Sequence, residues 1–145
     1  MRKKIQKDIQ VIIKKNKNFS NLNFKKIPNI MGILNLTPDS FSDGGKFIKK
    51  KAGLNHAKNL SKFGADIVDI GGESTRPGSK PVSEKEEWNR IEKIIKNIKK
   101  IYSLSLDTRK SEIMSKGIKM GIKLINDVSG LSYDPKTVDI LKKNK

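Results

Sequence analysis

The chain has 145 residues, enough for one domain with a hydrophobic core, and it lacks cysteine, which excludes disulfides, thiol nucleophiles and cysteine-ligated metals. Its formal net charge is +17 at pH 7, but the basic residues are spread along the chain and the aromatic residues form no stacking platform, so we expect no nucleic-acid partner. No apolar run approaches membrane-spanning length and no signal-peptide core is present, so we expect a cytoplasmic protein without membrane association.

The hydrophobic pattern predicts four strand–helix units that follow a basic N-terminal extension. The extension covers residues 1–16, of which 1–15 could form a short helix, and residues 17–27 form an extended lead-in to a domain that spans 17–145. The predicted strands are residues 29–35, 66–70, 103–106 and 122–126. The predicted helices are residues 47–64, a helix that begins with the capping box Ser83-x-x-Glu86, residues 110–120, and a helix with Asp134 as N-cap and Pro135 at its first position.

Apolar and small residues at helical spacing predict the inward face of each helix. His56 lies in the middle of the first helix, away from any strand end, and we expect it on the surface. The expected inward residues are Gly53, Ala57, Leu60 and Gly64 in the first helix, Trp88, Ile91, Ile94, Ile95, Ile98 and Ile101 in the second, and Ile113, Gly117 and Met120 in the third.

Alternating strands and helices predict an α/β fold with a parallel sheet. Polar residues follow the last apolar residue of all four strands, which is how a (β/α)8 TIM barrel builds its site. A doubly wound sheet would gather its ligand contacts at one switch point, and no G-x-G-x-x-G follows any strand. We therefore expect a barrel of which about the first four βα units are present, since a whole barrel takes roughly 250 residues.

Four segments carry a resemblance to a known family. MGILNLTPDSFSDGG at residues 31–45 breaks from an apolar run into turn-forming and carboxylate residues, which by composition alone could be a plain polar loop. It closely resembles the first signature of dihydropteroate synthases, and ADIVDIGGESTRPGS at 65–79 resembles the second. SLSLDTRKSE at 103–112 and LINDVSG at 124–130 match more weakly, in the family order. The methyltetrahydrofolate-binding barrels of corrinoid methyltransferases are related, but they lack the first signature.

The resemblance implies roles for residues of the first signature. Asn35 would join water and diphosphate oxygens around Mg²⁺, although an isolated asparagine here would read as a turn cap. Asp39 would stabilise positive charge that develops on the pterin methylene, and Phe41 would form a wall of the 4-aminobenzoate pocket.

Residues of the later segments would complete the substrate pockets. Thr75 would contact the pterin diphosphate, Arg76 would bind phosphate oxygens as a catalytic and binding residue, and Pro77 would stiffen the loop beside 4-aminobenzoate. Asp107 and Asn126 would hydrogen-bond the pterin ring, although Asp107 or Thr108 could instead cap the third helix. Asp127 would bond loop backbone.

The resemblance implies dihydropteroate synthase activity in folate biosynthesis, with Mg²⁺ as cofactor and a homodimer as assembly. In this reaction 4-aminobenzoate condenses with a dihydropterin methyl diphosphate and diphosphate leaves. Later family motifs are absent: a fifth-strand region, a pterin-binding Asp, a Lys that contacts both substrates and an Arg-x-His pair for the diphosphate. The alternatives are an inactive remnant, a half-chain that needs a complementing C-terminal chain, and a basic nucleic-acid-binding module.

Overall fold

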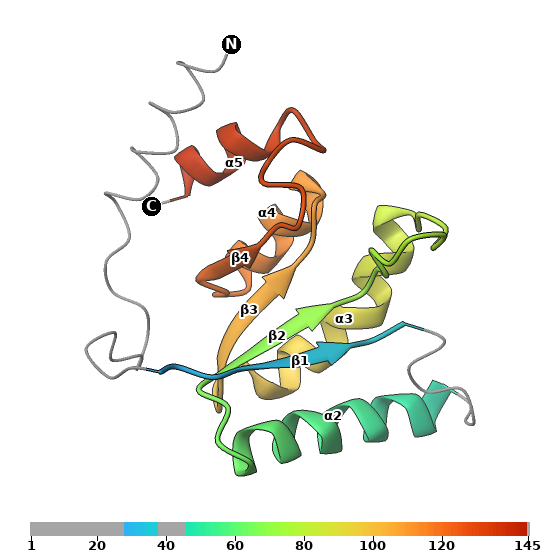
Figure 1. The fold of residues 1–145 in the computed structure, drawn as a ribbon, viewed down its shortest axis with the longest axis vertical. Coiled ribbons are helices and arrows are strands. Elements are labelled where there is room, and N and C mark those ends of the chain that lie inside the picture. Colours follow the sequence, from blue (N-terminus) through green and yellow to red (C-terminus); the bar gives the residue numbers. More distant parts are fainter. Residues whose placement is uncertain (1–27, 38–45, 145) are drawn as a thin grey trace.

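The computed structural model describes residues 28–37 and 46–144, and it confirms the four predicted strand–helix units (Figure 1). The predicted N-terminal helix and lead-in lie outside the described residues. The elements are β1 (Met31–Asn35), α2 (Lys46–Lys62), β2 (Ile67–Gly71), α3 (Glu84–Ile98), β3 (Ser103–Asp107), α4 (Ser111–Lys119), β4 (Leu124–Asn126) and α5 (Thr137–Lys143).

The four strands form one parallel sheet in the order β1-β2-β3-β4. The order never reverses, as it would at the switch point of a doubly wound sheet, so the described units have barrel topology. The register places the last residues of the strands in one row, because Asn35 pairs with Gly71, Gly71 with Asp107, and Asp107 with Asn126.

One face of the sheet packs against α2, α3 and α4 and forms the core. Leu34, Ile70 and Leu106 occupy matching positions on three strands and are completely buried. They contact a layer of helix residues, Ala57, Ile91, Ile94, Ile95, Ile98 and Ile113. A Cβ at Gly117 would stand 2.4 Å from Leu106 Cδ2, so only glycine allows α4 to lie this close to β3.

The opposite face of the sheet is apolar on the edge strand β1 and polar on the inner strands β2 and β3. On β1 this face is apolar and open, since Met31 and Ile33 are 39% and 59% exposed. On β2 and β3 it carries Asp69 and Ser105, which are 3% and 0% exposed. Buried polar side chains normally have hydrogen-bond partners, which makes this face a candidate binding site.

The helix boundaries confirm some sequence predictions and correct others. The Ser83 side chain caps α3 by accepting a hydrogen bond from Glu86 N–H at 3.2 Å, while the Glu86 carboxylate pairs with Arg90. Ile101 is 66% exposed, because α3 ends at Ile98 and a turn carries the chain away from the core. Gly64 is also exposed, with a positive φ of +98° that ends α2, so its assignment to the inward face was wrong.

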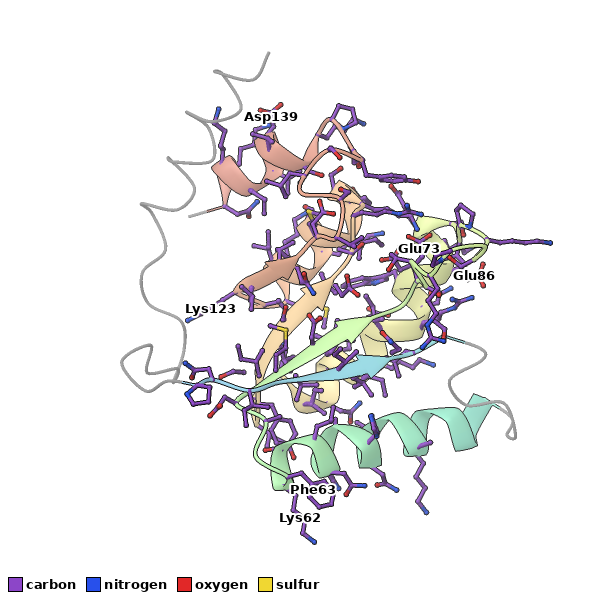
Figure 2. All side chains as sticks on the ribbon, viewed as in Figure 1. Lys62, Phe63, Glu73, Glu86, Lys123 and Asp139 are labelled. Carbon is purple, nitrogen blue, oxygen red and sulfur yellow. The ribbon has the colours of Figure 1, made fainter. Side chains whose placement is uncertain are left out.

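Other residue predictions for the helices are confirmed. His56 is exposed, and Trp88, Leu60 and Met120 are partly buried and pack against the core, as expected of inward residues. Figure 2 shows Phe63 at the end of α2, directed away from the sheet, where it is 82% exposed.

The predicted start of the last helix at Asp134 and Pro135 was wrong, since α5 begins at Thr137. Asp134 instead accepts hydrogen bonds from the backbone N–H groups of Lys136 at 2.9 Å and Ser111 at 2.9 Å. Ser111 is the first residue of α4, whose own N-cap residue, Lys110, makes no side-chain capping bond. Asp134 thus satisfies a free N–H at the start of α4 from a loop 23 residues later.

Candidate functional site

The carboxyl ends of the strands bring together three predicted site residues, Asn35, Asp107 and Asn126. Gly71 lies between Asn35 and Asp107 in the row and has no side chain. A Cβ placed on Gly71 would stand 3.2 Å from Asn35 Oδ1 and 3.3 Å from Asp107 Oδ2. The amide oxygen and the carboxylate therefore flank one space that Gly71 leaves open.

Asp69 adds a buried carboxylate just below this row, and the sequence analysis missed it. Asn126 Nδ2 donates a hydrogen bond to Asp69 Oδ2 at 2.8 Å, reaching from β4 to β2 across β3. On β3, Asp69 pairs with Ser105 and Asn126 pairs with Asp107, so the bond crosses β3 diagonally. Asp69 Oδ1 has no hydrogen-bond partner among the described residues, so one carboxylate oxygen remains available. The signal for this residue was a lone carboxylate within the apolar run of β2.

Asp107 has an unusual protonation equilibrium for an aspartate. Burial, followed by the negative charges of Asp69, Glu87, Asp127 and Glu73, raises its pKa to about 6. The carboxylate is ionised at neutral pH, and a neighbouring N–H donor would strongly stabilise its negative charge. It is not a helix cap, since α4 begins only at Ser111.

The loop between β2 and α3 carries three other predicted residues, Thr75, Arg76 and Pro77, and all are exposed. Hydrogen bonds within the loop shape its tip: the Ser79 hydroxyl donates to the carbonyls of Ser74 at 2.6 Å and Arg76 at 2.7 Å. The tip therefore presents an arginine and a threonine to solvent beside the strand ends. Asp39 and Phe41 lie outside the described residues.

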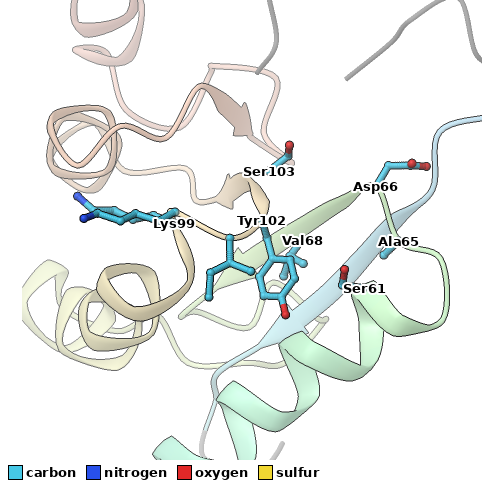
Figure 3. Close-up of a pocket in the computed structure, with 9 residues that line it drawn as sticks. Ser61, Ala65, Asp66, Val68, Lys99, Tyr102 and Ser103 are labelled. Atoms are coloured by element: carbon cyan, nitrogen blue, oxygen red, sulfur yellow. The ribbon is translucent and has the colours of Figure 1, made fainter. Parts of the chain in front are cut away.

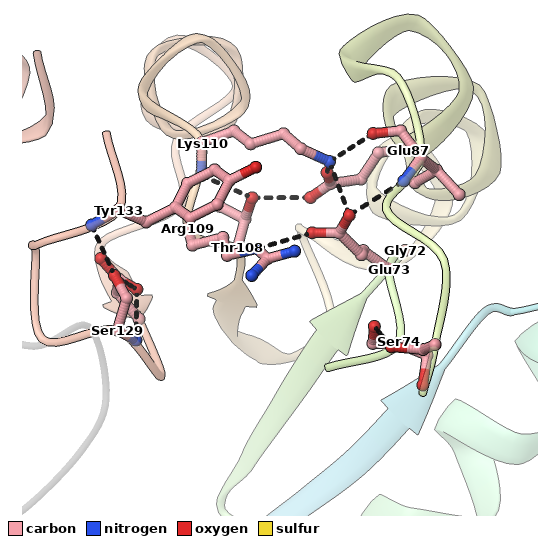
Figure 4. Close-up of polar contacts among 12 residues, drawn as sticks. Gly72, Glu73, Ser74, Glu87, Thr108, Arg109, Lys110, Ser129 and Tyr133 are labelled. Atoms are coloured by element: carbon pink, nitrogen blue, oxygen red, sulfur yellow. Dashed lines mark hydrogen bonds and ion pairs between the residues drawn. The ribbon is translucent and has the colours of Figure 1, made fainter. Parts of the chain in front are cut away.

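A buried cluster of charges closes the base of this loop (Figure 4). Glu73 Oε1 accepts hydrogen bonds from Val82 N–H at 3.0 Å and from Lys110 Nζ at 3.0 Å. Lys110 Nζ also donates to the Val82 carbonyl at 2.7 Å and to Glu87 Oε2 at 2.6 Å. Thr108 donates its hydroxyl to the other Glu87 oxygen at 2.6 Å. No role was predicted for Glu73, Glu87 or Lys110 from the sequence.

The charges in this cluster stabilise one another. Burial alone would raise the pKa of Glu73, but hydrogen bonds from Val82, Lys110 and Arg109 hold it below its ordinary value. Burial would lower the pKa of Lys110, yet its bonds to Glu87 and Glu73 raise it. Removing one member of such a buried pair leaves an uncompensated charge, which typically costs about 3–5 kcal/mol.

Arg109 links the cluster to the loop after β4. Its Nε donates to Glu73 Oε2 at 3.1 Å, and its guanidinium lies 4.1 Å from the ring centre of Tyr133. Asp127 shapes that loop, since it accepts bonds from the backbone N–H groups of Ser129 and Leu131 at 2.8 and 3.0 Å. The predicted structural role of Asp127 is confirmed.

Two hollows lie away from these strand ends. One, of about 200 Å³, opens at the amino-terminal ends of β2 and β3, where Asp66, Tyr102 and Ser103 line it (Figure 3). The other, of about 660 Å³, lies on the outer side of α3 and α4 beside Trp88. In the described part of the chain, no three His, Asp or Glu side chains group to hold a metal, and no helix is long and apolar enough to cross a membrane.

Comparisons with known sequences and solved structures agree on one family. The family described as pterin binding enzyme matches residues 31–145. The chain belongs to the pterin binding enzyme family. A Bacillus subtilis protein named dihydropteroate synthase is 46% identical to this family member over 123 residues, which cover 83% of the chain and 43% of the relative.

Solved structures of the family confirm the predicted fold class. A Clostridium difficile dihydropteroate synthase, solved in the presence of pteroic acid, matches with a TM-score of 0.80 and 42% identity over 85% of this chain. A Xanthomonas albilineans dihydropteroate synthase with 4-aminobenzoic acid matches with a TM-score of 0.76, 42% identity and 83% coverage. This family member spans 48% and 45% of those two chains, respectively, so it corresponds to less than half of each protein.

Proposed function

We propose that this chain supplies the first half of a dihydropteroate synthase active site. In the proposed reaction the amino nitrogen of 4-aminobenzoate attacks the methylene carbon of a dihydropterin methyl diphosphate. A C–N bond forms, the C–O bond to diphosphate breaks, and the nitrogen loses a proton. The observation that carries the proposal is the Asp69, Asp107 and Asn126 group at the strand ends of a pterin binding enzyme.

The pterin ring is assigned to this group because its chemistry is complementary. A pterin has an amidine-like edge that presents N–H donors, and the Asp107 carboxylate can accept two of them. The Asn126 amide can both donate and accept, and its bond to Asp69 fixes its orientation. Structures of family members with pteroic acid and 4-aminobenzoic acid support these classes of substrate.

The diphosphate is assigned to Arg76 and Thr75 at the tip of the β2–α3 loop, with Pro77 beside 4-aminobenzoate. A planar guanidinium suits phosphate oxygens, and the exposed loop tip leaves this group free to reach them. We assign Asp39 to stabilise the charge that develops at the methylene and Phe41 to the 4-aminobenzoate pocket, as the family resemblance implies.

Mg²⁺ fits the residues at this edge. Asn35 Oδ1 is a neutral hard oxygen that faces the space beside Gly71, with Asp107 Oδ2 across it. Asn35 would be the protein ligand, with diphosphate and water supplying the other oxygens. When bound, the ion would neutralise charge on the departing diphosphate.

We propose further that the functional protein is cytoplasmic and homodimeric, as the family resemblance implies, and that a complementing C-terminal chain can supply the later strand–helix units of the barrel. We disfavour the basic nucleic-acid-binding alternative because the basic residues are spread along the chain and do not form one patch with aromatic residues.

The test is calorimetric binding of a pterin ligand to the chain, alone and co-purified with the carboxyl-terminal half of the Bacillus subtilis relative. Asp107→Ala should weaken pterin binding by at least ~2 kcal/mol, since it leaves the N–H donors of the ligand unpaired. Asp139→Ala on α5 is the matched control and should leave the affinity unchanged. Equal affinity of Asp107→Ala and the unmodified chain would rule out the assignment.

A further inference from the structure

The β2–α3 loop is fastened at both ends by the same side chains. Glu73 stands at its start and Val82 at its end, nine residues apart. The Val82 N–H donates to Glu73, and the Val82 carbonyl accepts from Lys110. The eight residues between them, 74–81, are therefore held at both ends by hydrogen bonds that involve Glu73 and Lys110.

Every N–H group of the Lys110 ammonium has an acceptor, and the side chains involved are buried. Lys110 Nζ has three N–H donors, and its three acceptors are Glu73, Glu87 and the Val82 carbonyl. The side chains of Lys110, Glu73 and Glu87 are 8%, 4% and 0% exposed. In such surroundings water cannot replace a lost partner, so this arrangement holds the loop base in one geometry.

The lysine comes from the segment that also carries the proposed pterin carboxylate. Lys110 lies three residues after Asp107, at the point where β3 gives way to α4. Glu87 lies on the first turns of α3, directly after the loop. Through Lys110 the loop base is therefore tied to the strand end that would hold the pterin ring (Figure 4).

Gly72 shows how closely the loop base packs. A Cβ on Gly72 would stand 2.8 Å from the Glu87 carbonyl, and Arg90 Nη1 donates to the Gly72 carbonyl at 2.8 Å. By contrast, Thr75, Arg76 and Pro77 at the tip are exposed. The loop thus combines a fixed base with an accessible tip.

We propose that Glu73 and Lys110 are positioning residues, which hold Thr75 and Arg76 at a fixed place relative to Asp107 and thereby align the diphosphate with the pterin ring. This inference rests on the proposed function for its substrate. The positioning itself concerns only contacts within the chain.

Hydrogen exchange measured by mass spectrometry on the full chain tests the positioning without a ligand. Glu73→Ala should speed exchange of the amides in residues 74–82 at least tenfold more than it speeds exchange in β3 and α4. Glu73→Gln keeps an oxygen acceptor for Val82 N–H and Lys110, so it should restore most of the protection. Glu92→Ala removes the partly exposed carboxylate that pairs with Lys96 on α3, and it should change nothing in the loop.

Binding tests the consequence for substrate. Glu73→Ala should weaken binding of a pterin methyl diphosphate about tenfold and alter binding of the diphosphate-free hydroxymethyl pterin less than twofold. If Glu73→Ala speeds exchange in the loop but leaves the ratio of the affinities for the diphosphate and diphosphate-free pterins unchanged, the proposed alignment of the diphosphate with the pterin ring is wrong. Unchanged exchange in residues 74–82, or an equal acceleration there and throughout β2, β3 and α3, would overturn the positioning. If the unmodified chain binds neither pterin, the proposed function fails, while the exchange result still decides whether the loop base is fastened.

Discussion

Replacing Asp107 by asparagine should stabilise the fold at neutral pH, although it removes a residue from the proposed site. Asp107 is surrounded by Asp69, Glu87, Asp127 and Glu73, and these charges with burial raise its pKa to about 6. An ordinary aspartate in the unfolded chain has a pKa of about 3.9. The folded protein therefore binds the proton more tightly than the unfolded chain, and ionisation of Asp107 costs stability.

The magnitude follows from the shift. A shift of about two units, at about 1.36 kcal/mol for each unit, gives an upper bound near 3 kcal/mol. Because the carboxyl is only partly buried and water screens it, about 1–2 kcal/mol is the reasonable expectation. For this group stability is highest below the unfolded pKa near 4 and falls as the pH rises towards 6, above which the whole loss is present.

Urea denaturation between pH 3.5 and pH 8 measures this effect. Asp107→Asn should exceed the unmodified chain by about 1–2 kcal/mol at pH 8, and the difference should shrink to nothing near pH 3.5. Asp139→Asn, an exposed carboxylate on α5, provides the matched control. A difference that is absent at pH 8, or that persists unchanged at low pH, would refute the electrostatic reasoning.

Three further outcomes are expected. Asn35→Ala should reduce affinity for a pterin diphosphate in the presence of Mg²⁺ while binding of the diphosphate-free pterin stays nearly intact; equal loss for both ligands in calorimetry would point to a structural asparagine. Gly117→Ala should lower the free energy of unfolding by about 1–3 kcal/mol in urea titration, because the added methyl collides with Leu106; an unchanged midpoint would mean that α4 shifts freely. The chain on its own should form oligomers in size-exclusion chromatography, because β1 and β4 are the two edge strands of the sheet among the described residues and Ile33 on β1 is exposed, and co-expression with a carboxyl-terminal half should suppress this. A monodisperse, cooperatively melting monomer with synthase activity would contradict that last expectation.

The fold could be predicted from the sequence because each unit has strong local signals. Apolar strands followed by polar residues fixed the positions of all four strand ends, and the Ser83 cap set the start of α3. Ile101 misled because it continues the spacing of isoleucines beyond the residue where the helix ends. Asp134 and Pro135 misled because the carboxylate caps α4 in space rather than the helix that follows it in sequence.

The charged cluster could not be predicted in the same way. Glu87 lies four residues before Ile91 on the inward face of α3, which signals an unusual buried charge. Its partner Lys110 is 23 residues away on another unit, and nothing local shows that the two meet. Only the arrangement of α3 beside the β3–α4 junction brings them together.

The bond between Asn126 and Asp69 also has a thermodynamic consequence. It joins β4, a strand of only three residues at the edge of the described sheet, to the inner strand β2. A molecule that competes for the same Asp69 oxygen would release Asn126. A molecule that binds the remaining hydrogen-bonding groups of Asn126 and leaves the bond to Asp69 intact would instead hold β4 in place. Occupancy of the strand ends and fraying of the sheet edge are then linked, and each must influence the other to the same degree. Amide exchange in β4 with and without saturating pterin would reveal the sign of that linkage, and identical exchange rates would show that the two events are independent.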